Sequence, residues 1–236
     1  MSLHQHFVAS TLAVITLASA ASASIAAPVF YGPSAYLSSA DIPVGFYAGA
    51  SPTFLDTLED GALNGGLSAN TGSVISPAQW GSLVDSVDAD DGNIDGLGNQ
   101  GHSWFSGSGS AGITFTFNSP TQLPTAFGLV WTDGAGSITF SARGEDGALL
   151  GSSTFSGFAD NSFYGTTADD RFLGVHFAGG VKSITISNSS GGIEVDHIQY
   201  GHMVTAVPEP ETYSMLLAGL GLIGTVARRR SAKANA

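Results

Sequence analysis

Alternation of apolar and polar residues between Ile113 and Asp196 constrains the fold of this chain more than any other feature. A period of two places one set of side chains inward and the other outward along a β-strand. The apolar members of these runs are Ile113, Phe115 and Phe117; Phe127, Leu129 and Trp131; Ile138 and Phe140; Leu173, Val175 and Phe177; Ile184 and Ile186; and Ile193 and Val195. Turn sequences separate the runs at Asp133-Gly134, Glu145-Asp146-Gly147, Gly179-Gly180 and Gly191-Gly192. Short strands at this spacing predict an all-β fold, an antiparallel β-sandwich or jelly roll.

The last run changes its inward face. Ile193 and Val195 have odd positions, whereas Ile198 and Tyr200 have even positions. The switch near Asp196-His197 predicts a β-bulge or a bend in the strand. Earlier in the chain, the stretch from Phe54 to Leu63 fits either a turn or an opening strand.

The N-terminal end predicts a secretory signal peptide. Residues 1–27 contain no Asp, Glu, Lys or Arg, and Phe7 to Ala18 is an apolar run that precedes Ala18-Ser19-Ala20. A short apolar core before an A-x-A-like site is the layout of a signal helix. We expect residues 1–27 to be this signal and residues 28–207 to be the exported β-sandwich domain. A buried helix of the mature domain is the alternative for the first segment.

The C-terminal end combines three parts in a fixed order. Pro208, Glu209 and Pro210 come first, an uncharged stretch from Thr212 to Ala227 follows, and Arg228, Arg229 and Arg230 come next. As a helix the uncharged stretch would be roughly 24 Å long, shorter than the roughly 30 Å hydrocarbon core. The arginines can reach the interface on their long stems and stay cytoplasmic, so the bulk of the chain would lie outside. We therefore expect a short transmembrane helix at this end.

Residues 208–236 resemble the PEP-CTERM sorting signal of Gram-negative bacteria. The resemblance implies recognition by an exosortase, an inner-membrane protease or transpeptidase, and cleavage near Pro208, Glu209 and Pro210. It further implies a membrane-anchored precursor that is released or transferred to the cell surface or the extracellular matrix. The family is associated with exopolysaccharide producers, and hence with biofilm. A plain single-span anchor is the alternative.

Composition excludes several classes of protein. The chain has 19 Asp and Glu against 7 Lys and Arg, a formal net charge of −12, and no cysteine. The acidic balance excludes nucleic acid as the main partner. The lack of cysteine excludes a disulfide scaffold, thiol catalysis and cysteine-ligated metals. Between residues 28 and 207 the Lys and Arg residues are Arg143, Arg171 and Lys182 alone, so the exported domain attracts divalent cations.

Two groups of acids are candidates for calcium. Asp-rich loops supply the roughly 6–8 oxygen ligands that Ca²⁺ takes. The stretch from Asp85 to Gly96 holds five Asp, and its candidate ligands are Asp88, Asp90, Asp91 and Asp95. The second group joins acids near the two ends of the domain, Glu59 and Asp196 among them. The alternatives are a solvated acidic loop with Asx turns and an ordinary strand end with outward acids.

The interior also resembles the β-sandwich domains common in proteins with this tail, at Leu58 to Gly61, Asp85 to Gly96 and Gly191 to His197. Its layout is similar to carbohydrate-binding jelly rolls, in which one structural Ca²⁺ ties the first strand to the last. That resemblance implies a metal shared by Glu59 and Asp196.

No complete catalytic motif occurs, since Gly101-His102-Ser103 is only half of a Gly-x-Ser-x-Gly elbow. We therefore expect no enzyme activity. Aromatic residues are candidates for stacking on a sugar: Trp104 and Phe105 after the Asp-rich stretch, and Phe158, Phe163 and Tyr164 in a later loop. Core packing is the alternative for each of them. The sequence favours an exported, calcium-dependent polysaccharide-binding module. A secreted polysaccharide hydrolase or lyase, and a purely structural matrix component, are the alternatives.

Overall fold

Two long strands, β7 (Ala126–Arg143) and β10 (Ser183–Met203), organise the fold. They belong to a computed structural model that describes residues 26–87, 101–118, 122–159, 162–165, 169–203, 216–217, 219–224 and 227–228. The two strands pair antiparallel over almost their whole length, with shifts of register in the middle. Each strand therefore runs through two halves of one 10-stranded sheet.

The first half combines the beginning of β7 with the end of β10. β9 (Arg171–His176) pairs with β7, and β1 (Val29–Ala35) pairs with β9. β2 (Ala50–Asp56) covers the free side of β10. All these pairs are antiparallel, and the order is β1-β9-β7-β10-β2.

The second half combines the end of β7 with the beginning of β10. β8 (Leu149–Phe155) pairs with β7, β6 (Ile113–Phe117) pairs with β10, and β3 (Leu67–Ala69) pairs with β6. Between the halves, β5 (Ser103–Ser106) pairs with the middle of β10, and β4 (Ser73–Ile75) pairs with β5. Strands that cross from one half to the other through register shifts let the sheet fold over on itself.

The main hydrophobic core lies between the two halves. The alternating residues that the sequence predicts to point inward lie in this core. They form one hydrophobic cluster with side chains from β6, β7, β9 and β10. Its largest member, Trp131, is fully buried. The prediction of an antiparallel all-β fold is confirmed, while the jelly-roll connectivity remains a prediction.

A second, smaller cluster covers the outer face of β7 and β9. It contains Tyr36, Phe46, Val87, Ala126, Val130 and Phe172. Because of this layer, β9 is buried on both faces in its centre.

Helices are few and short in the part of the domain that the structure describes. They are η1 (Ser39–Asp41), α1 (Pro77–Trp80) and η2 (Gly81–Leu83). Residues 216–217, 219–224 and 227–228 near the C-terminus are also helical. Among the described residues, no helix is both long enough and apolar enough to cross a membrane. The predicted signal peptide covers residues 1–27, of which residues 1–25 lie outside the described ranges.

Two of the four predicted turns are wrong. Asp133-Gly134 lies inside β7 and Gly191-Gly192 lies inside β10, where the strands bend without ending. The other two predicted turns are confirmed, because Gly147 N donates to Gly144 O at 3.0 Å and Gly180 N donates to Phe177 O at 2.9 Å. For the stretch from Phe54 to Leu63 the sequence left a turn or an opening strand open. The structure has strand β2 up to Asp56, followed by a turn.

The predicted change of face in the last strand is confirmed. The register of β10 against β7 shifts between Asp196 and Gln199, and His197 has a φ of 43°. Ile198 and Tyr200 consequently point into the main core after the bulge.

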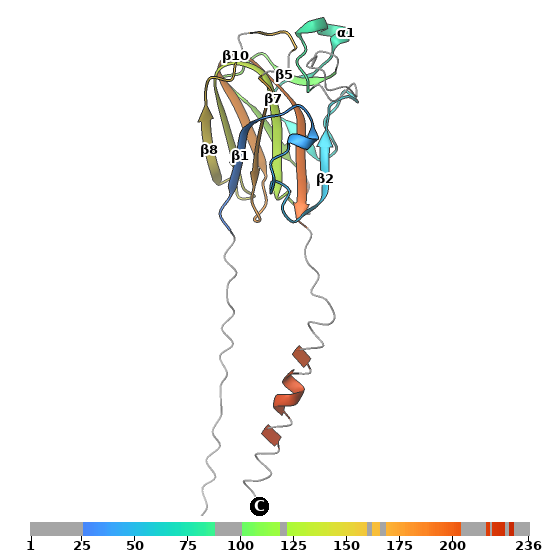
Figure 1. Cartoon of the computed structure of the whole chain (residues 1–236), viewed down its shortest axis with the longest axis vertical. Coiled ribbons are helices and arrows are strands. Elements are labelled where there is room, and N and C mark those ends of the chain that lie inside the picture. Colours follow the sequence, from blue (N-terminus) through green and yellow to red (C-terminus); the bar gives the residue numbers. More distant parts are fainter. Residues whose placement is uncertain are drawn as a thin grey trace, which may run out of the picture.

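The bends of β7 and β10 define one end of the domain, here called the bent end. Val29 at the start of β1 and Gly201 near the end of β10 both lie in the row of Ala126, at the other end of β7 from Asp133. We call this opposite end the terminal end. Figure 1 shows α1 at the bent end and the start of β1 at the terminal end.

Candidate functional site

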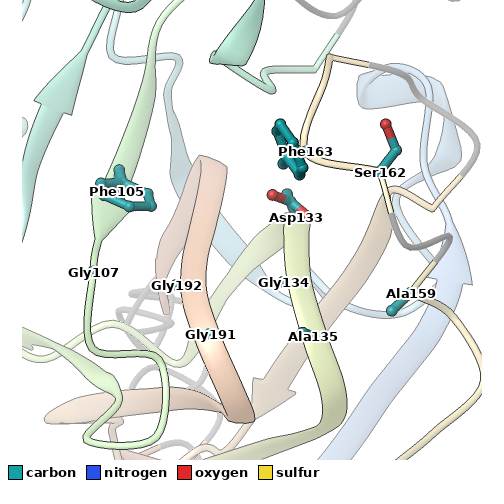
Figure 2. A pocket seen from close by; sticks show the side chains of 10 residues that line it. All are labelled: Phe105, Gly107, Asp133, Gly134, Ala135, Ala159, Ser162, Phe163, Gly191 and Gly192. Atoms are coloured by element: carbon teal, nitrogen blue, oxygen red, sulfur yellow. The ribbon is translucent and has the colours of Figure 1, made fainter.

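A pocket of about 470 Å³ opens at the bent end (Figure 2). Its lining comes from the bends of β7 and β10, from the end of β5 and from the segment around Phe163: Phe105, Gly107, Asp133, Gly134, Ala135, Ala159, Ser162, Phe163, Gly191 and Gly192. A smaller cavity of about 160 Å³ adjoins it and is lined by Ile75, Trp80, Leu83, Phe105, Asp133, Phe163 and Glu194. The larger volume falls in the range of roughly 300–1,000 Å³ typical of ligand sites.

Aromatic rings form one side of both cavities. Trp80 is 49% exposed and Phe163 is 60% exposed, although each is a large apolar side chain. Trp80 lies 6.1 Å from Phe105 between ring centroids, and Phe163 lies 4.9 Å from Tyr164. We call Trp80, Phe105, Phe163 and Tyr164 the aromatic patch. A cluster of exposed rings beside a cavity marks a binding surface.

The strand register explains which side chains face the pocket. Phe105 in β5, Glu194 in β10 and Asp133 in β7 are direct cross-strand partners, so they form one row on the outer face. The next row along the same strands is Trp104, Val195 and Trp131, and it faces the main core.

The sugar-binding candidate Trp104 therefore lies on the other side of its strand from the pocket. Its Nε1 donates to Thr71 O at 2.9 Å, and its ring meets Phe115 edge-on at 6.0 Å. A ligand role for Trp104 stays a prediction. The neighbouring Phe105 lines both cavities.

Two acids of β10 hold the segment Val84 to Val87 over the outer face. Asp85 N donates to Glu194 Oε1 at 2.7 Å, and the Ser103 hydroxyl donates to the same oxygen. Val87 N donates to Asp196 Oδ2 at 2.8 Å, and His197 N donates to Asp196 Oδ1 at 2.6 Å. The outward acids of the last strand are thus buried under this segment and bound to backbone N–H groups.

Further buried acids gather around Asp85. Its side chain is only 2% exposed, and Asp169, Asp170 and Glu194 are buried as well. Burial, followed by the nearby charges of Asp170 and Asp169, raises the pKa of Asp85 to about 11. Burial also raises the pKa of Glu194 to about 8, against the lowering effect of its hydrogen bond from Ser103.

One carboxylate oxygen of Asp85, Oδ1, has no hydrogen-bond partner among the described residues. Thr132 Oγ1 donates to the backbone carbonyl of Asp85 at 2.8 Å and fixes the position of this residue. Buried carboxylates of like charge are unfavourable unless a proton or a cation neutralises them. The chemistry of this cluster therefore suits a proton or a cation.

The two predicted calcium ligands Glu59 and Asp196 have different hydrogen-bond partners among those described, and a metal shared by them stays a prediction. Glu59 accepts from His102 N at 2.7 Å, and its other oxygen lies 2.7 Å from His102 Nδ1. Asp88, Asp90, Asp91 and Asp95 lie outside the described residues. Within the described ranges, no three His, Cys, Asp or Glu side chains are grouped closely enough to hold a metal ion.

A buried hydrogen-bonded group lies on the β10 bulge itself. His197 Nδ1 is 3.0 Å from the Tyr36 hydroxyl, and Gln199 Nε2 donates to that hydroxyl at 3.0 Å. Burial lowers the pKa of His197 to about 4, so the ring is neutral at neutral pH. The sequence signalled the bulge through the change of parity, but it carried no signal for the partner Tyr36.

Comparisons with known proteins bear mainly on the C-terminus. Residues 206–231 match the family described as the PEP-CTERM protein-sorting motif. No curated protein matches the chain. One solved structure, the C-terminal family 22 carbohydrate binding module of Clostridium thermocellum Xyn10B, is 16% identical, with a TM-score of 0.30 over 67% of this chain and 98% of that chain. So low a score does not establish a common fold.

The match confirms the resemblance predicted from Pro208, Glu209 and Pro210, which themselves lie outside the described residues, as do Arg229 and Arg230. Arg228 lies in the helical part and is exposed. The C-terminus of this chain is therefore a PEP-CTERM protein-sorting motif, which implies that the protein is exported and processed by an exosortase.

Proposed function

We propose that this exported protein binds polysaccharide at the bent end, without catalysis, after an exosortase has sorted it to the cell surface or the extracellular matrix. The aromatic patch carries this proposal. Trp80 and Phe163 expose large apolar rings next to a pocket whose floor is the glycine-rich backbone of Gly134, Gly191 and Gly192. Aromatic rings beside a few polar groups suit the apolar faces and hydroxyl rims of sugar rings.

The position of the pocket supports this role. The domain is joined to the predicted signal segment and to the sorting motif at its terminal end, whereas the aromatic patch lies at the bent end. A protein anchored through its C-terminal helix, or attached near Pro208, would therefore present the pocket away from the point of attachment. A long polymer could reach it without meeting the membrane.

Binding is tested with the full-length protein in mild detergent, by calorimetry against neutral, acidic and amino-sugar polysaccharides. We expect binding to at least one class and no release of reducing ends. Phe163→Ala should weaken that binding about tenfold, because it removes an exposed ring. Leu149→Ala, at an equally exposed side chain of β8, is the matched control and should bind normally. Absence of binding would favour a purely structural matrix component, and steady product release would favour a hydrolase or lyase.

We also propose that Ca²⁺ binds at the bent end. The buried Asp85, with one oxygen lacking a hydrogen-bond partner among the described residues, supports a cation beside its carboxyl group. Asp85 begins the acidic stretch that continues to Asp88, Asp90, Asp91 and Asp95, from which further ligands would come.

Thermal unfolding with Ca²⁺ and with EDTA tests this second proposal. We expect Ca²⁺ at 100 times its Kd to add about 2.7 kcal/mol to the unfolding free energy. Asp85→Asn should remove the calcium effect, whereas Asp146→Asn, in the exposed β7–β8 turn, should leave it intact. Identical melting curves with Ca²⁺ and with EDTA would refute calcium binding while leaving polysaccharide binding open.

A further inference from the structure

We propose that the smaller cavity at the bent end is a cage for a protonated amine, so that the bound polysaccharide is an amino-sugar polymer with free amino groups. This inference rests on the proposed polysaccharide binding and names the class of sugar. It does not follow from rings alone, since rings would accept neutral sugars equally well. The charges around the rings decide the ligand class.

The lining of the cavity combines rings with carboxyl groups. Trp80, Phe105 and Phe163 provide three aromatic faces, and Asp133 and Glu194 provide two carboxyl groups. Ring faces attract cations through their quadrupole, most strongly when the cation is partly removed from water. Neither Lys nor Arg is among the described residues that line the cavity.

The row of cross-strand partners places these groups next to one another. Glu194 lies between Phe105 and Asp133 in the register of β5, β10 and β7. Phe163 reaches the same space from the segment after β8. Figure 2 shows Asp133 and Phe163 in the lining of the adjoining larger pocket. A ligand amine in the cavity would therefore meet a carboxylate and a ring face together.

The three basic residues between residues 28 and 207, Arg143, Arg171 and Lys182, are not among the described residues that line the cavity. Arg143 Nη1 donates to Gly147 O, and Lys182 N donates to Arg143 O, which places both residues near the β7–β8 turn. Arg171 lies 4.9 Å from the centre of the Phe158 ring, and its Nη1 donates to Asp170 O.

The buried acids Asp85, Asp169 and Asp170 lie close to the cavity wall, since Asp85 N donates to Glu194. Ionised acids in a poorly solvated region strengthen the attraction for a cation and repel anions. Asp85 and Glu194, whose pKa values are raised to about 11 and about 8, add little charge at pH 6. Uronic acids and sulfated sugars would meet repulsion in this site, which makes the same charges a source of specificity.

The test compares three oligosaccharides of equal length with the full-length protein, by calorimetry at pH 6. These are an oligomer of glucosamine, an oligomer of N-acetylglucosamine and an oligomer of glucose. We expect the glucosamine oligomer to bind at least tenfold more tightly than the other two. Raising the salt concentration should reduce this preference, because the Debye length falls from about 10 Å at 0.1 M to about 3 Å at 1 M.

Two variants assign the effect to the cavity. Asp133→Asn should weaken the binding of the glucosamine oligomer about tenfold and leave the N-acetylated oligomer unchanged. Glu145→Gln removes one negative charge from the β7–β8 turn, far from the cavity, and should change neither. Phe163→Leu keeps an apolar side chain but removes the ring, so it should lower the preference for the amine even if Asp133→Asn folds poorly.

The outcomes separate the two proposals. Equal affinity for all three oligomers would overturn the amine cage while keeping polysaccharide binding at the patch. A preference for the amine that persists in Asp133→Asn and in Phe163→Leu would also overturn it, since general charge attraction would then explain the result. No binding of any oligomer or polymer would defeat the proposed function itself.

Discussion

The two ends of the domain are built from the same strands but differ in what they bury. At the bent end, buried acids lie under the Val84 to Val87 segment while large rings remain exposed. At the terminal end, the sheet begins and ends in ordinary antiparallel pairing between β1, β9, β7, β10 and β2. Buried charge and exposed apolar area both reduce stability. At the bent end the two features occur together beside a cavity, which is why we place the proposed binding site there.

The largest expected difference in stability is between removing a buried acid of the bent end and removing an exposed acid of the β7–β8 turn. Asp196 accepts from the N–H groups of Val87 and His197, and Asp146 accepts from Ala148 N at 2.9 Å. We expect Asp196→Ala to cost about 3 kcal/mol, because two buried donors lose their acceptor. Asp146→Ala should cost about 0.5 kcal/mol. Urea unfolding of both variants measures the difference, and equal costs would show that the buried acids contribute nothing special to the bent end.

Replacing two glycines of the same pocket by alanine should also have different effects on stability. A Cβ at Gly134 would lie 2.6 Å from Asn188 Cγ, and Asn188 cannot easily move. Its Oδ1 accepts from Trp131 Nε1 at 3.0 Å, while its Nδ2 donates to Gly192 O at 2.6 Å. We expect Gly134→Ala to lose about 2.5 kcal/mol by overpacking this group.

Gly107 lines the same pocket, but a Cβ there would meet nothing within 4 Å. Gly107→Ala should therefore be neutral or slightly stabilising, since alanine reduces the entropy of the unfolded chain. Thermal unfolding of the two variants compares them directly. A strongly destabilising Gly107→Ala would mean that the pocket is narrower than its lining indicates.

The bent end should also make stability depend on pH. Glu194 and Asp85, whose pKa values are raised to about 8 and about 11, hold protons that the unfolded chain releases. Their contribution is therefore present at low pH and is lost as pH rises from the ordinary carboxyl range toward those values. Between pH 6.5 and 8 the titration of Glu194 alone should lower the unfolding free energy by about 2 kcal/mol.

His197 acts in the opposite direction but at lower pH. Because its pKa is lowered to about 4, its contribution is complete above about 6.5 and is lost as pH falls toward 4. Denaturant unfolding in EDTA from pH 4 to 8 tests both effects. Glu194→Gln should flatten the upper part of the profile, and a rise in stability from pH 6.5 to 8 in the unaltered protein would contradict the placement of these acids.

The main core could be predicted from the sequence because alternation is a local signal. Phe115, Trp131 and Ile186 point inward as the period of two requires. The bulge at His197 was equally visible, since a change of parity is a count along one segment. The bends at Gly134 and Gly191 could not be predicted from the sequence, because the same residue types occur in turns and in bent strands. Only the partner strand decides between these two.

The site was less predictable for a different reason. Asp85 meets Asp169 and Asp170 across the fold, and no spacing in the sequence connects them. Trp104 and Phe105 are neighbours of similar chemistry on a short strand. The face of each depends on the pairing of β5 with β10, which places Trp104 beside Val195 and Phe105 beside Glu194.

The exposed pair of Glu59 and His102 should give the smallest effect. Unlike Glu194 and Asp196, which are buried, these two side chains are about one-third exposed at their 2.7 Å contact. Glu59→Gln keeps the shape and removes the charge, so it should cost about 0.5 kcal/mol, the usual size for exposed pairs. Calorimetric melting in Ca²⁺ and in EDTA sharpens the comparison, because the calcium effect should be the same as in the unaltered protein. Loss of the calcium effect in Glu59→Gln would instead place the ion on Glu59, as the resemblance to carbohydrate-binding jelly rolls implied, and would move it away from the buried acids around Asp85.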